Sequence, residues 1–302
     1  MARATGKILS GEPRWRTQGL FRWLTALLMI VGFVLVYFFF LIYPSLRVLQ
    51  LSFTNADIAG KGVFVGLANY ARLLQDPNFW NALWNTLYFI LLTVVPNTLL
   101  GFIMALLVLR LRRAQKLVLA AFFLPYVLPV SVVTNLWIWL LDQNFGIINY
   151  LSQSSIAWFQ DPVFAMPAVA FVTIWWTVGF NILLFMAALQ NVPRELYEAA
   201  QLDGATSTQV FRYITWPMVW PVTSLVLLLQ LIAQFKIFDQ VYLLTGGGPF
   251  DKTMVVLLLL YRSAFQQQQG GYSSTIGVVL LVVILLTSLV QARYSGLGRR
   301  TS

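Results

Sequence analysis

Residues 191–217 read NVPRELYEAAQLDGATSTQVFRYITWP, a polar stretch that lies between two long apolar segments. Pro193 suits the first turn of a helix, and Gly204 suits the position just after a helix ends. Thr206 begins a T-x-x-Q capping box, which predicts the start of a second short helix. We expect Pro217 to end that second helix ahead of the next apolar segment. The stretch therefore predicts a helix–turn–helix element outside the membrane, with small residues that let a partner approach closely.

The apolar segments of the chain are long enough to cross a membrane. Hydrophobic residues make up 59% of the 302 residues and charged residues only 10%, whereas soluble domains carry about 25% charged residues. A bilayer core requires roughly 20 apolar residues per helix, and these runs are too continuously apolar for barrel strands. Six segments qualify: residues 20–43, 84–109, 117–141, 167–189, 218–238 and 274–291. We therefore predict an all-α membrane protein with six transmembrane helices.

A further apolar run at residues 254–260 is too short to span a bilayer. It ends at Arg262 and a run of glutamines. We expect this run to form a helix packed at the outer membrane face, and a seven-span arrangement is the alternative.

The basic residues predict the orientation of the chain. Six spans place both termini on one side, and fourteen of the twenty basic residues lie on that side. Because basic residues gather in cytoplasmic loops, we expect both termini in the cytoplasm. Residues 1–19 then form a basic tail, residues 20–293 a six-span domain and residues 294–302 a second tail. This topology accounts for the net charge of +10 without a nucleic-acid partner.

Several kinds of chemistry are excluded by residues that the chain lacks. It has no cysteine and no histidine, which excludes disulfides, thiol catalysis and Cys/His metal sites. None of the ten acidic residues falls inside a predicted span, which argues against a proton-driven carrier and a carboxylate-ring channel. The phosphate-binding pattern GxxxxGK[ST] does not occur. The chain is therefore not expected to bind ATP, and energy for transport would come from another subunit.

Neutral polar residues recur on single faces of the predicted spans. The third span has Ser131 and Asn135, the fourth has Thr173, Thr177 and Asn181, and the fifth has Gln230 and Gln234. One interpretation is hydrogen bonding between helices. The other is a polar pore wall for a neutral, hydroxyl-rich solute, because amides both donate and accept. For that pathway the candidates are Asn135, Asn181, Gln230 and Gln234, and Trp137, Trp139, Trp175 and Trp176 could stack on sugar rings.

One motif resembles a known family. Glu198, Ala199 and Ala200, followed by Gly204, Ile214 and Pro217, reproduce the EAA signature of permease subunits of bacterial ABC importers, with Trp216 in place of its leucine. LPYVLP at 124–129 and TGGGP at 245–249 are similar to the carbohydrate-uptake branch of the maltose and glycerol-phosphate type.

The resemblance implies a type I ABC importer permease fold in the bacterial plasma (inner) membrane. It implies that residues 191–217 form a coupling loop that docks on an ATPase subunit, through Glu198, Ala199, Ala200, Asp203, Gly204, Ile214 and Pro217. The implied partners are a second homologous permease, two ATP-binding subunits that hold ATP and Mg, and an extracytoplasmic solute-binding protein. The chain itself would hold no cofactor and no catalytic residue.

The implied solute is a sugar or oligosaccharide that crosses a pathway shared with the second permease. Two alternatives stay open at this stage. The chain could serve an importer for a non-sugar solute such as a glycerol-phosphate compound, or it could act alone as a secondary carrier.

Overall fold

The computed structural model describes residues 15–111 and 113–294. The chain divides into two compact units, residues 1–50 and residues 51–302. The first unit contains a continuous helical run made of α1 (Trp15–Tyr37), the π turn η1 (Phe38–Ile42) and the start of α2 (Tyr43–Leu51). All side chains from residue 27 to residue 50 are exposed in this chain. The surface of residues 27–44 has no charged side chain, which is typical of a helix in lipid or against another membrane helix.

The second unit consists almost entirely of helices. Their order along the chain is α3 (Ala68–Gln75), α4 (Pro77–Leu109), α5 (Gln115–Val127), α6 (Val130–Leu140), α7 (Ile147–Ser152), α8 (Ala165–Gln190), α9 (Arg194–Leu202), α10 (Ser207–Val210), η2 (Phe211–Thr215), α11 (Trp216–Phe235), α12 (Asp239–Leu244), α13 (Val256–Tyr261), η3 (Arg262–Gln266) and α14 (Gly270–Tyr294).

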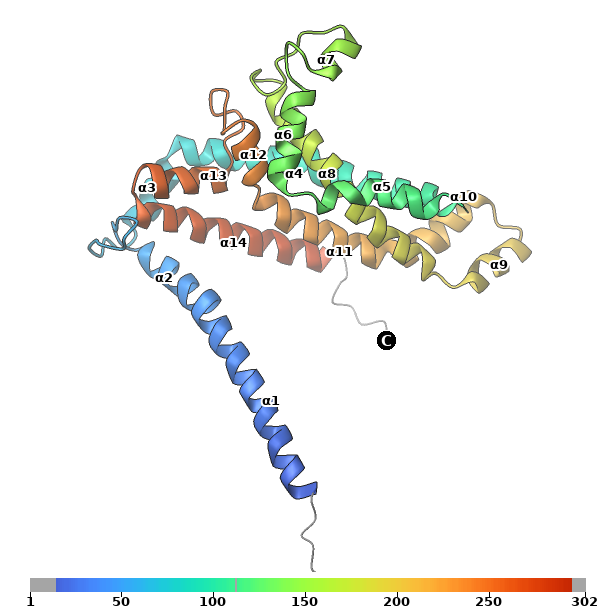
Figure 1. Ribbon diagram of the computed structural model, residues 1–302, viewed down its shortest axis with the longest axis horizontal. Helices are drawn as coiled ribbons and strands as arrows, with labels where there is room; N and C mark the ends of the chain where they lie inside the picture. Colours follow the sequence, from blue (N-terminus) through green and yellow to red (C-terminus); the bar gives the residue numbers. More distant parts are fainter. Residues whose placement is uncertain (1–14, 112, 295–302) are drawn as a thin grey trace, which may run out of the picture. The chain divides into compact units, whose positions relative to one another are not determined.

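The centre of this unit is formed by α4, α8 and α11, which run alongside one another (Figure 1). Small residues bring the helices together, as is usual between membrane helices. A Cβ on Gly101 would lie 2.7 Å from the Asn181 Cβ, which shows how closely α4 approaches α8. A Cβ on Gly179 would lie 2.0 Å from the Phe122 carbonyl oxygen, so α5 is equally close to α8. A fully buried Phe89 marks one apolar cluster and Phe185 marks the other.

Within the described residues, five helical segments are long and apolar enough to cross a membrane: Leu27–Leu51, Pro77–Leu109, Ala165–Gln190, Ser207–Phe235 and Gly270–Tyr294. The second of them begins earlier than expected, because Asp76 accepts a hydrogen bond from the Asn78 backbone N–H and caps the helix at Pro77. The segments agree with the predicted fold class and with five of the six predicted spans.

The third predicted span, residues 117–141, is not one helix. It consists of α5 and α6, which meet at a bend of 102°. Pro129 has no N–H group and disfavours helical backbone at the residue before it. Accordingly, Leu128 is extended, with φ −72° and ψ 142°. The number of spans is therefore six only if this bent pair is counted as one.

The prediction that Pro217 ends a helix is wrong. The helix continues from Ser207 to Phe235, a run of 29 residues, and Pro217 is the second residue of α11. The π turn η2 lies directly before it, and the Trp216 N–H donates to the Phe211 carbonyl, five residues back. A π turn resets the hydrogen-bonding register, so a residue without an N–H group is accommodated there.

The short apolar run at 254–260 forms α13, which packs into the core through Val256 and Leu258. The loop before it is tied to α4. The Asn85 side chain donates to the carbonyls of Asp251 and Met254 at 2.9 Å each. The Arg262 guanidinium donates to the Gly246 carbonyl at 2.6 Å and pairs with Asp251 at 3.3 Å. These bonds hold the TGGGP loop against the start of α4.

Candidate functional site

The element between α8 and α11 projects from one end of the second unit (Figure 1). Its helix α9 ends where Gly204 takes a φ of +72°, a backbone conformation that favours glycine. The Ala205 N–H then donates to the Ala200 carbonyl at 2.9 Å. Thr206 forms the predicted capping box with Gln209 and starts α10. The predicted helix–turn–helix is therefore present.

The outward surface of this element carries most of the residues of the EAA signature. Glu198, Ala199, Asp203 and Gly204 are exposed, and Ala200 is half-buried. No atom lies within 4 Å of the place where a Cβ on Gly204 would stand. Beside them, Leu202 is 90% exposed.

The inward surface of the element is anchored to α11. The hydroxyl groups of Tyr197 and Thr215 lie 3.2 Å apart. Ile214 packs on the apolar cluster that contains Phe102 and Phe185, whereas Pro217 is exposed. The signature residues thus divide into an exposed group on α9 and its turn, and an anchor at Ile214.

A cavity of about 280 Å³ lies between α5, α8 and α11. It is lined by Tyr126, Thr177, Phe180, Asn181, Leu184, Val226, Leu229, Gln230, Ala233 and Gln234. Three of the four predicted pathway residues, Asn181, Gln230 and Gln234, are therefore brought together in one place. None of the lining residues is charged.

Hydrogen bonds fix the polar wall of this cavity. The Gln234 side chain donates to the Gln230 Oε1 at 3.2 Å. On α8, Thr177 accepts a bond from the Asn97 Nδ2 at 2.8 Å, and the Asn181 Nδ2 donates to the Asn97 carbonyl at 3.4 Å. The polar residues of α8 thus bond to a neighbouring helix and also line a cavity. Both interpretations of these residues apply.

Two aromatic residues of the cavity were missed by the sequence analysis. The rings of Tyr126 and Phe180 stack with centroids 5.1 Å apart and an interplanar angle of 15°. Tyr126 belongs to the LPYVLP run, and Phe180 directly precedes Asn181, so both stand in stretches that the sequence already marks. The tryptophans proposed for stacking lie elsewhere: Trp137, for example, packs edge-on against Trp175.

Asn135 lies outside this cavity. Its side chain is exposed and donates to the Ser131 carbonyl on its own helix at 2.7 Å. The bend before α6 turns this helix away from α5, which lines the cavity. In the described part of the chain, no group of three or more acidic residues could hold a metal ion.

The fold and these two sites define the class: a helical membrane protein with an uncharged cavity among its helices and an exposed helix–turn–helix element. Residues 97–296 match the family described as Binding-protein-dependent transport system inner membrane component. The chain belongs to this family, and the resemblance stated above is confirmed.

Similar proteins include permeases and one solved transporter. The sulfoquinovosyl glycerol transport system permease protein SmoG of Agrobacterium fabrum is 32% identical over 253 residues, which is 80% of each chain. The sn-glycerol-3-phosphate transport system permease protein UgpA of Escherichia coli is 33% identical over 81% of this chain and 83% of its own. A chain of a bacterial alginate ABC transporter, solved with an alginate pentasaccharide-bound periplasmic protein, has a TM-score of 0.81 at 23% identity, over 94% of this chain and 97% of that one.

Proposed function

We propose that this chain is one permease subunit of an ATP-driven, binding-protein-dependent importer for a saccharide. Its cavity forms part of the solute pathway, and a second homologous permease supplies the rest. Two ATP-binding subunits hold ATP and Mg, and this chain carries out no chemical step of its own. The termini and the α9–α10 element face the cytoplasm, and an extracytoplasmic solute-binding protein delivers the solute to the opposite face.

The observation that carries the proposal is the chemistry of the cavity. Its polar groups are amides and hydroxyls, which donate and accept hydrogen bonds as sugar hydroxyls do. The stacked Tyr126 and Phe180 add flat apolar surface, which suits the C–H face of a sugar ring. Because no basic side chain lines the cavity, a neutral saccharide fits better than a phosphate ester.

The coupling role rests on the exposed group at α9. Glu198 presents a carboxylate to solvent, Ala199 and Gly204 allow close backbone approach, and Ile214 holds the element on the bundle. We assign the ATPase contact to this surface. Asp203 lies at the C-terminal end of α9 on the same surface, and Pro217 lies at the start of α11.

Purification in mild detergent from the native host, followed by reconstitution, tests the proposal. We expect an ATPase and a second permease to co-purify, and labelled saccharide to enter liposomes only with ATP and the solute-binding protein present. Uptake of saccharide by this chain alone without ATP would instead identify a secondary carrier. Saccharide uptake that is outcompeted by glycerol phosphate would favour the phosphate ester as solute.

A further inference from the structure

A polar cavity lies away from the pathway residues, among helices that stand at the end of the bundle opposite α9 (Figure 1). It has a volume of about 550 Å³ and lies between α3, the start of α4, α13, η3 and the start of α14. Small-molecule sites typically measure about 300–1,000 Å³. The volume of this cavity therefore falls within the range of a small-molecule site.

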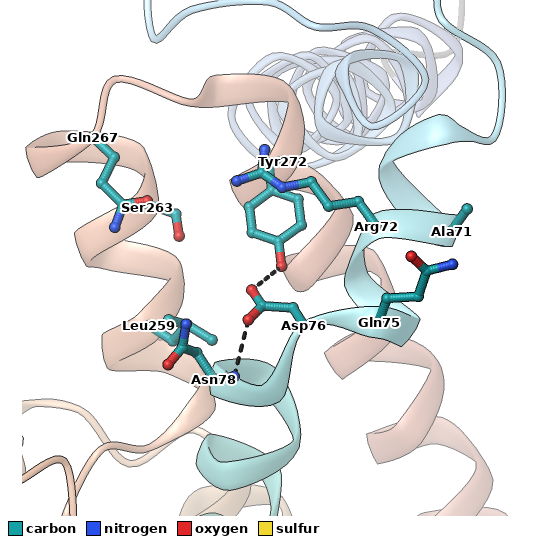
Figure 2. A pocket seen from close by; sticks show the side chains of 9 residues that line it. All are labelled: Ala71, Arg72, Gln75, Asp76, Asn78, Leu259, Ser263, Gln267 and Tyr272. Carbon is teal, nitrogen blue, oxygen red and sulfur yellow. Dashed lines mark hydrogen bonds between the residues drawn. The ribbon is translucent and has the colours of Figure 1, made fainter.

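A rigid framework supports one wall of this cavity (Figure 2). The Tyr272 hydroxyl donates to the Asp76 Oδ2 at 2.5 Å, and the Asp76 Oδ1 accepts from the Asn78 N–H at 2.9 Å. The Arg72 guanidinium lies over the Tyr272 ring, 4.1 Å from its centroid. One cation and one anion therefore contact the same tyrosine, and their charges balance.

Four polar side chains of the lining, including Arg72, have hydrogen-bonding groups that are available to a ligand. The side chains of Arg72, Gln75, Asn78 and Gln267 line the cavity, and none of them forms a hydrogen bond with the described residues of the chain. The three amides both donate and accept, and Arg72 offers planar donors. Such a set with balanced charge matches a neutral ligand with many hydroxyl groups.

The cavity continues in two directions along the surface. A hollow of about 220 Å³ shares Asn78, Leu259 and Gln267 with it. A hollow of about 200 Å³ on the other side shares Arg72 and Tyr272. We call the three together the outer groove. Its extended form suits a chain of linked rings better than a single compact molecule.

We propose that the outer groove is a second saccharide-binding site, separate from the cavity between α5, α8 and α11. It would hold an oligosaccharide through its hydroxyl groups at the face where the solute arrives. This inference rests on the proposed function for its ligand class, but it concerns different residues.

Binding of neutral trisaccharides to the assembled importer in nanodiscs tests this proposal. The probes are maltotriose, cellotriose, mannotriose and raffinose, titrated calorimetrically without ATP and without the solute-binding protein. The Gln234→Leu importer is used as background, because it removes a contact of the other cavity. We expect at least one probe to bind, and Asn78→Leu or Gln267→Leu to weaken its binding at least tenfold.

Asn144→Leu is the matched control, since Asn144 is an exposed amide outside the groove; it should leave binding unchanged. Melting temperatures identify any variant that fails to fold. If Asn78→Leu unfolds the chain, Gln267→Leu at the end of η3 serves as the test. Binding of no probe overturns the second site. The unchanged importer is titrated in parallel. Binding to it that is lost in the Gln234→Leu importer, and that the groove variants keep when Gln234 is present, also overturns the second site, while supporting the proposed function.

Discussion

At the scale of the residue, the decisive feature is a pair of amides in an apolar helix. Gln230 and Gln234 are 8% and 4% exposed, and a single bond joins them. Burying an unsatisfied polar group costs about 1–3 kcal/mol. Neither residue has an enclosed polar atom without a partner, so the rest of their hydrogen-bonding capacity is open to the cavity.

Replacement of one of these amides should impair transport without harming the fold. Gln234→Leu keeps the volume roughly constant and removes a group that could bond a sugar hydroxyl. We expect saccharide uptake to fall about tenfold or more, equivalent to roughly 1.4 kcal/mol of lost binding. The measurement is initial uptake in proteoliposomes, with co-purified partners as the check on assembly.

The matched control for this change is Asn135→Leu, which removes an exposed amide outside the cavity. It should transport at the rate of the unchanged protein. Equal uptake by both variants would remove Gln234 from the pathway.

At the scale of the element, one side of α9 packs against the bundle and the other side is exposed. The Tyr197–Thr215 contact and the packing of Ile214 fix its position, whereas Glu198 and Leu202 are exposed in this chain. This open side, which carries Glu198 and Leu202, is the surface to which we assign the ATPase contact.

Charge reversal on this surface should uncouple the importer. Glu198→Arg places a cation where the proposed ATPase contact lies, and we expect uptake to be abolished while the permease remains in the membrane. Glu195→Arg is the control, because Glu195 is an exposed acid on the same helix and outside the signature. Its reversal should lower helix stability only through the dipole, by about 0.3–1 kcal/mol. Loss of uptake in both variants to the same degree would contradict a specific role for Glu198.

Elements also show where sequence reasoning succeeds. The turn at Gly204 and the capping box at Thr206 follow from local chemistry, and both are present as predicted. The predicted end of a helix at Pro217 is absent. The five-residue π turn directly before Trp216 changes the hydrogen-bonding register, so the helix continues through the proline. The break at Leu128 and Pro129 is signalled by the proline, but the 102° bend depends on packing that no local pattern contains.

In the candidate site, too, local sequence predicts some residues, whereas the positions of others depend on packing between helices. Amides on one face of a helix predict Gln230 and Gln234, and their neighbours across the cavity come from α8 and α5. Tyr126 could not be placed there from its own helix, since contacts between α5 and α8 depend on the close approach at Gly179. Asn135 shares its spacing with the true lining residues and is separated from them by the bend.

At the scale of the whole molecule, the two ends of the second unit differ in kind. One end carries the α9–α10 element, and the other carries α3, α13 and the tied TGGGP loop (Figure 1). The proposed function requires these ends to face opposite sides of the membrane.

The absence of cysteine from the sequence makes this orientation measurable. Single cysteines introduced as Asn144→Cys and Ser207→Cys provide labels on exposed residues. A membrane-impermeant maleimide added outside the cell membrane should modify the first variant, and the second only after permeabilisation. The unchanged chain, which has no thiol, is the blank. Labelling in the reverse order would invert the proposed topology.

The continuous helix from Ser207 to Phe235 links the exposed α9–α10 element to the cavity. At about 1.5 Å per residue, its 29 residues form a rod roughly 43 Å long. Its near end is α10, which belongs to the exposed α9–α10 element, and its far end carries Gln230 and Gln234. A tilt of a few degrees at the near end therefore displaces the two amides by ångströms, without a hinge between them. We expect the width of the cavity to change when this helix tilts as one piece, because the helix stays continuous through the π turn and Pro217.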